Sequence, residues 1–478
     1  MTDQNPVAGD QPVASWGALL SGTNGLRSIA LAGGIALHAT NIFIVTTIWP
    51  SVVRDIGGID LYAWNTTIYV IASITASVLA VALLDRVGPR KAYASAALLF
   101  AVGAVMAALS PSMPIMLAGR FVQGLGAGFL VALAYTIIRI IFPEALWPRA
   151  IALNACMWGI ATVIGPAIGG VFAELGIWRM AFWTSLPFTV GFAGIAFVVL
   201  PGKLPTTIKP APIPAARLTV LCLALLSLSF IGSLVNILTA FVGAALAIGF
   251  ASLFVAMEKK AQHRLLPSAV LLPRTSGFAL YALIWLLTMT LTIAEIFTPF
   301  FLQVLHGRSA LWAGYLSSLV ALGWTASSVF ISGAQGKVAA RAVRAGPILL
   351  IIATSVLAIF MPLWGPTHML ALVPICCALA ALGVGMGLVW PHLLSLATKH
   401  TPSREHHLAG TAITTIQMLA SATAGALAGF IANAAGLNDA GGMDGNAQAA
   451  FSLFGISLIT AIIGFVAAGR AVRPAQIG

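Results

Sequence analysis

Long apolar runs follow one another along almost the whole chain, and short polar or basic segments separate them. A run of about 17 to 25 apolar residues is long enough to cross a bilayer as a helix. The pattern therefore predicts an all-α integral membrane protein with fourteen transmembrane helices. The predicted spans are 28–50, 63–84, 91–110, 114–138, 150–173, 180–200, 217–234, 237–257, 278–303, 310–332, 346–364, 369–396, 408–433 and 450–470.

The spacing of these runs predicts two similar halves. Six spans end at residue 200, and six more run from 278 to 470, with an uncharged stretch over 218–257 between them. Forty uncharged residues are enough for two crossings with a turn near 233–236. The predicted organisation is a tail (1–27), a six-helix bundle (28–200), a linker (201–216), an extra hairpin (217–257), a second linker (258–277), a second six-helix bundle (278–470) and a tail (471–478).

Composition and charge place the chain in a membrane and orient it there. Hydrophobic residues make up 60% of the chain and charged residues 8%, and the mean hydropathy is +1.01. With both termini in the cytoplasm, twenty of the 24 Lys and Arg residues fall on the cytoplasmic side. The net charge of +12 is thus a topology signal and does not indicate nucleic-acid binding. We expect a multi-pass protein of the cytoplasmic (inner) membrane whose surroundings are the lipid bilayer.

Four motifs stand in order along the first half. They are "LLDRVGPRKAY" after the second span, "LAGRFVQGLGAGF" in the fourth, "GIATVIGPAIGG" in the fifth and "WRMAFWTSLPF" at the start of the sixth. Together with the fourteen spans they resemble the major facilitator superfamily, and specifically its fourteen-span drug:proton antiporter branch. The resemblance implies the major facilitator fold, alternating access around a midplane site, and export of a small-molecule substrate. One departure concerns Asn41, which stands where the family has an acid in its first helix.

The proline and glycine motif of the fifth span is unusual in an apolar helix, because proline removes a backbone hydrogen bond and glycine removes a side chain. It predicts a bent helix packed closely against a partner, and the resemblance places this contact at the seam between the two halves. The alternative is a packing kink with no role in transport. The motif residues are Gly159, Gly165, Pro166, Gly169 and Gly170.

The short loop after the second span combines one acid with several cations. The resemblance implies a cytoplasmic latch that breaks as the halves rock, whereas ordinary positive-inside charge would explain the cations without the acid. The latch residues are Asp85, Arg86, Gly88, Arg90 and Lys91.

Three charged or histidine residues lie well inside predicted spans, away from the span ends, where a charge is costly: His38, Arg120 and Glu295. Glu295 is the one acid well inside a span, and it is the first candidate for a proton and cation site. Arg120 lies at a similar depth, so it can pair with Glu295 across a cavity or extend to the lipid headgroups. His38 can carry a proton where the acid is missing, or it can be a neutral packing residue. A Glu295 satisfied by a neighbouring helix is the corresponding alternative for that residue.

Other polar and aromatic residues are candidates for a substrate cavity. Those on the ninth span share one helical face with Glu295. The full set is Asn41, Gln123, Tyr135, Asn154, Trp158, Trp285, Thr288, Thr292, Gln303, Trp324, Trp390 and Gln417.

The sequence contains no phosphate-binding loop and no catalytic or metal-ligand pattern, so we expect neither an enzyme nor a cofactor. We predict a monomeric secondary transporter that exports amphipathic drugs or metabolites in exchange for protons. The alternatives are an importer or facilitator of a neutral or aromatic metabolite, which Asn41 favours, and a non-transporting receptor.

Overall fold

The computed structural model describes residues 15–202, 215–231, 237–261, 264, 266–273, 275–363, 371–401, 405–437 and 442–472. All regular elements in these residues are helices, as expected for a chain in lipid, where only internal hydrogen bonds can satisfy the backbone. Twelve helices in the described ranges are long and apolar enough to cross a membrane.

The elements in chain order are α1 (Trp16–Leu20), α2 (Gly22–Ile56), η1 (Ile59–Leu61), α3 (Trp64–Ala108), α4 (Met113–Ile141), η2 (Glu144–Leu146), α5 (Trp147–Glu174), α6 (Met180–Trp183), α7 (Ser185–Val199), α8 (Ala215–Ile231), α9 (Ile237–Lys260), η3 (Ser268–Leu271), α10 (Ser276–Val304), α11 (Ala310–Ser317), α12 (Leu319–Ile331), α13 (Gly336–Phe360), α14 (Leu372–His400), α15 (His406–Ala434) and α16 (Met443–Ala471).

Two elements account for the difference between twelve candidate helices and fourteen predicted spans. The predicted spans 63–84 and 91–110 both lie in α3, whose 45 residues are interrupted at Gly88. There φ is 76° and ψ is 165°, a conformation that glycine adopts without steric cost. Helix α8 has only 17 residues. Fourteen crossings therefore require that α3 crosses twice and α8 once. The predicted hairpin turn near 233–236 lies outside the described residues.

The helices extend beyond several of the predicted spans. Helix α2 begins at Gly22 and ends at Ile56, where Gly57 with φ of 72° stops it, and it contains Pro50. Helix α13 begins ten residues before the predicted span, at Gly336. Hydropathy marks the part of a helix that is apolar enough for lipid, whereas the helix itself continues until a cap or glycine ends it.

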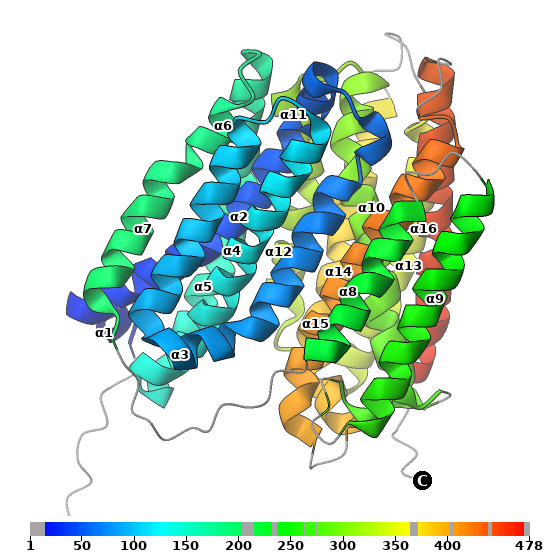
Figure 1. Ribbon diagram of the computed structural model, residues 1–478. Coiled ribbons are helices and arrows are strands. Elements are labelled where there is room, and N and C mark those ends of the chain that lie inside the picture. Colours follow the sequence, from blue (N-terminus) through cyan, green and yellow to red (C-terminus); the bar gives the residue numbers. More distant parts are fainter. Residues whose placement is uncertain are drawn as a thin grey trace, which may run out of the picture.

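The helices pack in two groups and a hairpin (Figure 1). In the N-terminal group, α2 packs on α5 and α7, and α3 packs on α4. In the C-terminal group, α12 and α13 pack on α14, and α10 packs on α15 and α16. Helices α8 and α9, green in Figure 1, pack on each other, and α8 also contacts α15 and α3.

Candidate functional site

A buried polar cluster surrounds Arg120 inside the N-terminal group. This side chain is 2% exposed. Its Nε donates to Asn65 Oδ1 at 2.8 Å, and its Nη1 donates to Asn41 Oδ1 at 2.6 Å and to Gln123 Oε1 at 2.5 Å. The guanidinium carbon lies 4.1 Å from the ring centre of Tyr69. Three amide oxygens and an aromatic face thus hold this cation, and no carboxylate is among its partners.

His38 joins the same cluster through Tyr69. Its Nδ1 lies 2.9 Å from the Tyr69 hydroxyl, and its ring stacks on that tyrosine. The edge contact between His38 and Trp158 has a centroid distance of 5.6 Å. Sequence reasoning missed Asn65 and Tyr69, although two polar residues four apart in an apolar run lie on one helical face.

The structure corrects two expectations for Arg120. At 2% exposure it does not extend to the headgroups. It also forms no ion pair with Glu295 in this conformation, because its donors are held by amides of α2, α3 and α4.

Glu295 lies in the most buried part of α10. Every other residue from Leu287 to Leu302 is buried, whereas the Glu295 side chain is exposed. No hydrogen bond or ion pair joins its carboxylate to another residue of the described ranges. The expectation that a neighbouring helix satisfies this acid is therefore wrong for this conformation. The side chain is exposed between tightly packed neighbours, so its carboxylate is available to a proton or a cation.

The remaining candidates on α10 do not all face one space. The Thr292 hydroxyl lies 3.2 Å from Ser421 Oγ of α15, and the Trp285 indole donates to Met289 Sδ. Gln303 contacts the N-terminal group, since it accepts from Arg54 at 3.1 Å and donates to the Thr47 carbonyl oxygen at 3.4 Å. Thr288 Oγ1 is buried without a hydrogen-bond partner.

The candidates outside α10 are spread over both groups. Tyr135 and Trp158 are exposed at 39% and 40%. Trp324 and Trp390 form an edge-to-face pair inside the C-terminal group, and Gln417 is half-buried on α15.

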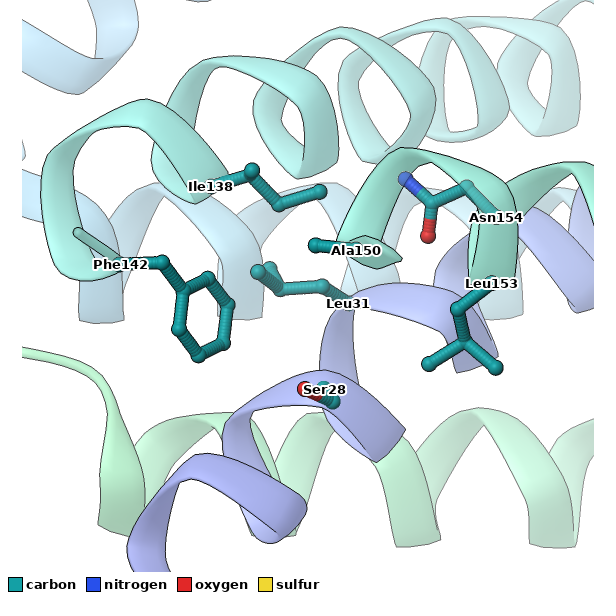
Figure 2. Close-up of a pocket in the computed structure, with 7 residues that line it drawn as sticks. All are labelled: Ser28, Leu31, Ile138, Phe142, Ala150, Leu153 and Asn154. Atoms are coloured by element: carbon teal, nitrogen blue, oxygen red, sulfur yellow. The ribbon is translucent and has the colours of Figure 1, made fainter. Parts of the chain in front are cut away.

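Asn154 borders a small crevice. It is buried, and its Nδ2 has no hydrogen-bond partner. The crevice is shallow and lies between α2, α4 and α5 (Figure 2). Its other lining residues are Ser28, Leu31, Ile138, Phe142, Ala150 and Leu153. It lies within one helix group, so it is not a site shared by both halves.

The proline and glycine motif packs against two different helices through two faces of α5. A Cβ at Gly165 would meet Phe43 and Thr40 of α2, and one at Gly169 would meet the Ile44 oxygen at 2.8 Å. These two glycines therefore pack inside the N-terminal group, which corrects their placement at the seam between halves.

Pro166 and Gly170 are the motif residues that lie at the seam between the two halves. A Cβ at Gly314 of α11 would lie 2.9 Å from Pro166 Cβ, and one at Gly170 would meet the Leu311 backbone of α11. Helix α5 continues through Pro166 to Glu174. On the same face a Cβ at Gly159 would meet nothing within 4 Å.

Contacts between the two groups gather at the predicted outer end. Besides the α5–α11 contact, Tyr62 stacks on Phe297 at a centroid distance of 5.0 Å. Asn433 Nδ2 donates to the backbone carbonyl oxygen of Asp60 at 2.9 Å. Ser318 Oγ donates to the backbone carbonyl oxygen of Thr162 at 3.0 Å.

Within the part of the chain that the structure describes, the predicted latch residues form hydrogen bonds to their own group only. Arg90 Nε donates to the Leu200 oxygen at 3.1 Å at the end of α7. Asp85, Arg86 and Lys91 are exposed, and Asp85 has no hydrogen-bonding or ionic partner in the described ranges. The structure thus leaves the predicted latch unengaged.

Comparisons with known proteins agree with this architecture. The chain is 33% identical over 473 residues to a Mycobacterium tuberculosis protein named "Probable multidrug-efflux transporter", covering 96% of this chain and 97% of the relative. It is 29% identical over 379 residues to the multidrug transporter protein MdtP of Bacillus subtilis, covering 76% of this chain and 66% of that protein.

Solved structures show the same fold. A POT family transporter superposes with a TM-score of 0.66 at 13% identity and covers 94% of this chain and 97% of its own. A bacterial homologue of the human lysosomal transporter Spinster, in an inward-facing and unoccupied conformation, gives 0.65 at 12% identity and covers 95% and 98%. The sequence model of the Major Facilitator Superfamily matches residues 31–425. The chain is therefore a multi-pass transporter of the Major Facilitator Superfamily.

Proposed function

We propose that the protein exports amphipathic drugs or metabolites across the cytoplasmic membrane in exchange for protons. The M. tuberculosis relative, which matches 96% of this chain, is named for multidrug efflux, and MdtP, which matches 76%, is named for multidrug transport. These names support the class of substrate and the direction of transport. Alternating access needs two groups of helices that separate at one end at a time. The contacts at the predicted outer end fit a conformation that is closed there and open toward the cytoplasm.

The observation that carries the proton-coupled reading is the Glu295 side chain. It is the one acid well inside a span, it is accessible, and it has no partner in the described ranges. An intramembrane acid is costly, so its retention in an accessible position favours a role in binding a proton or a cationic substrate. Because one carboxylate can bind either a proton or a cationic substrate, it links the movement of protons to the movement of substrate.

Arg120 and His38 are the other ionisable candidates, and both lie in the N-terminal group. The Arg120 charge is fixed by three amide oxygens, which cannot titrate. His38 can titrate, and it is linked to Arg120 through Tyr69. We assign Glu295 the exchangeable proton and His38 a secondary role.

Glu295→Gln tests this assignment because it keeps the side-chain size and removes the titrating group. In proteoliposomes the variant should bind a neutral substrate normally yet lose accumulation driven by a pH gradient. His38→Gln should have the smaller effect, and Glu295→Asp should retain part of the coupling. Undiminished gradient-driven transport by Glu295→Gln would transfer the assignment to His38.

A facilitator or importer of a neutral or aromatic metabolite is the second candidate. Asn41 favours it, since this amide stands at the family's acidic position and binds Arg120 at 2.6 Å. Wild-type transport that is indifferent to the pH gradient would support the facilitator and exclude the antiporter.

The proposed topology has fourteen crossings, with residues 217–257 as an inserted hairpin and both termini in the cytoplasm. Two crossings return the chain to its starting side, so both flanking linkers are cytoplasmic. Cysteines introduced at Thr206 and Gln262 should resist a membrane-impermeant maleimide added outside intact cells. Labelling of either position would leave twelve or thirteen crossings instead. We also propose that the protein works as a monomer, and that Asp85 and its neighbouring cations form the latch when the cytoplasmic end closes.

A further inference from the structure

One face of α5 is packed against α11 at the predicted outer end, and the same face is exposed nearer the cytoplasm. Pro166 and Gly170 on this face contact α11. Gly159 and Ala152 lie seven and fourteen residues before Pro166, so they share its face. Ala152 is exposed, and a Cβ at Gly159 would meet nothing within 4 Å. Ala155, between them, is exposed as well.

Helix α12 shows the matching pattern on the other side of this seam. Ser318, just before α12, bonds to the Thr162 oxygen of α5 at 3.0 Å. The residues four, seven and eleven positions later continue the same face toward the cytoplasm. Of these, Leu322 and Val329 are 51% and 72% exposed, and Thr325 is exposed. The two helices thus meet at Thr162 and Ser318, and Ala152 and the α12 positions that continue these two faces toward the cytoplasm are exposed.

The other seam between the groups lies between α3 and α15, and there a third helix intervenes. At the outer end α3 and α15 meet, since a Cβ at Gly429 would lie 3.0 Å from Ala63 Cβ. A Cβ at Gly425 of α15 would likewise meet the Thr67 hydroxyl of α3. Eight residues beyond Thr67, about 12 Å along the helix, Thr75 Oγ1 lies 3.3 Å from Cys222 Sγ of α8. Leu221 and Leu225 of α8 are buried in the core that includes α3 and α15 residues. Helix α8 therefore covers this seam.

Two carboxylates attach the α8–α9 hairpin to the C-terminal group through the linker that follows α9. Glu258, which is 0% exposed, accepts from Arg217 at 2.7 Å and from the Leu266 amide at 2.8 Å. Glu405, at the start of α15, accepts from the Ser268 amide at 2.8 Å and from its hydroxyl at 2.7 Å. The hairpin is thus joined to the C-terminal group by these bonds, and α8 also contacts Thr75 of α3.

We propose that amphipathic molecules dissolved in the cytoplasmic leaflet enter sideways through the gap between α5 and α12, while α8 closes the gap between α3 and α15. The exposed faces of α5 and α12 continue the packed interface between the two groups. They are therefore part of the seam between the groups and not of the outward surface of either group. Small side chains on α5 leave room for an organic molecule. Trp158 of the same helix, 40% exposed, lies against His38 of the buried polar cluster. This inference rests on the proposed export of amphipathic substrates.

Ala155→Trp tests the entrance by filling it. Ile160→Trp is the matched control, because Ile160 is 46% exposed on a different face of the same helix. In proteoliposomes with a pH gradient, the probes are Hoechst 33342, which partitions into bilayers, and ethidium, which is presented from water. Ala155→Trp should raise the half-saturating concentration of Hoechst 33342 at least about threefold and leave the maximal rate and ethidium transport unchanged. Ile160→Trp should change neither dye.

Equal losses for both dyes, or no loss for Hoechst 33342, would overturn the entrance. Wild-type protein that transports neither dye would instead count against the proposed function. A second measurement keeps the two failures apart, because it needs no transport. With the native cysteines replaced by serine, a nitroxide on Ala155→Cys should collide with oxygen dissolved in the bilayer, and one on Thr75→Cys should be shielded by α8. Equal shielding at the two positions would refute the asymmetry whatever the dyes show.

Discussion

Gly170→Ala should favour the conformation that is open at the predicted outer end. The added Cβ would meet the Cα of Leu311 and lie 2.8 Å from its Cβ, so helix backbones must move apart. Because α5 and α11 belong to different groups, this clash exists only while the outer end is closed. The substitution therefore destabilises one end state of the transport cycle and leaves the folded N-terminal group intact.

The size of the effect follows from the cost of overpacking. An extra methyl group in a packed contact costs about 1–3 kcal/mol. Since 1.4 kcal/mol is a factor of about ten, the equilibrium should shift toward the outward-open state by about 5- to 150-fold. Gly159→Ala is the control on the same helix, because its Cβ would meet nothing within 4 Å.

A cysteine at Gln303 reports the shift, because Gln303 contacts Arg54 and the Thr47 oxygen across the closed outer end. In a background without native cysteines, an impermeant maleimide should label this position faster in the Gly170→Ala variant than in the Gly159→Ala variant. Gly165→Ala should lower stability without changing the labelling rate, since Gly165 faces α2 of its own group. Equal labelling rates for Gly170→Ala and Gly159→Ala would refute the two-face assignment of the motif.

Two further predictions concern the buried polar cluster and the hairpin. Asn65→Ala removes the partner of Arg120 Nε at 2.8 Å, so it should destabilise the detergent-solubilised protein by about 1.5–3 kcal/mol. A lower midpoint of thermal unfolding would show this, and an unchanged midpoint would mean that water replaces the amide. Thr75→Cys should form a disulfide with native Cys222 on mild oxidation, because the present side-chain atoms are 3.3 Å apart. Retention of both free thiols, counted by maleimide mass labelling, would place α8 elsewhere.

Hydropathy alone determined that this chain is a helical membrane protein, because lipid leaves the backbone no other way to satisfy its hydrogen bonds. The sequence also singled out Arg120 and Glu295, since an ionisable group inside an apolar run is conspicuous whatever its neighbours are. The sequence did not show which residues surround Arg120 and Glu295. Two of the three amides that hold Arg120 come from helices 55 and 79 residues away in the chain, and a one-dimensional pattern does not say which helices meet.

The proline and glycine motif shows the same division most clearly. Its composition predicted close helix packing, because small residues permit it in lipid. Which helix each residue meets was decided by the tertiary structure. Gly169 and Gly170 are adjacent in sequence, yet a helix turns by about 100° per residue. One therefore faces α2 within its own group, and the other faces α11 across the seam that must open and close.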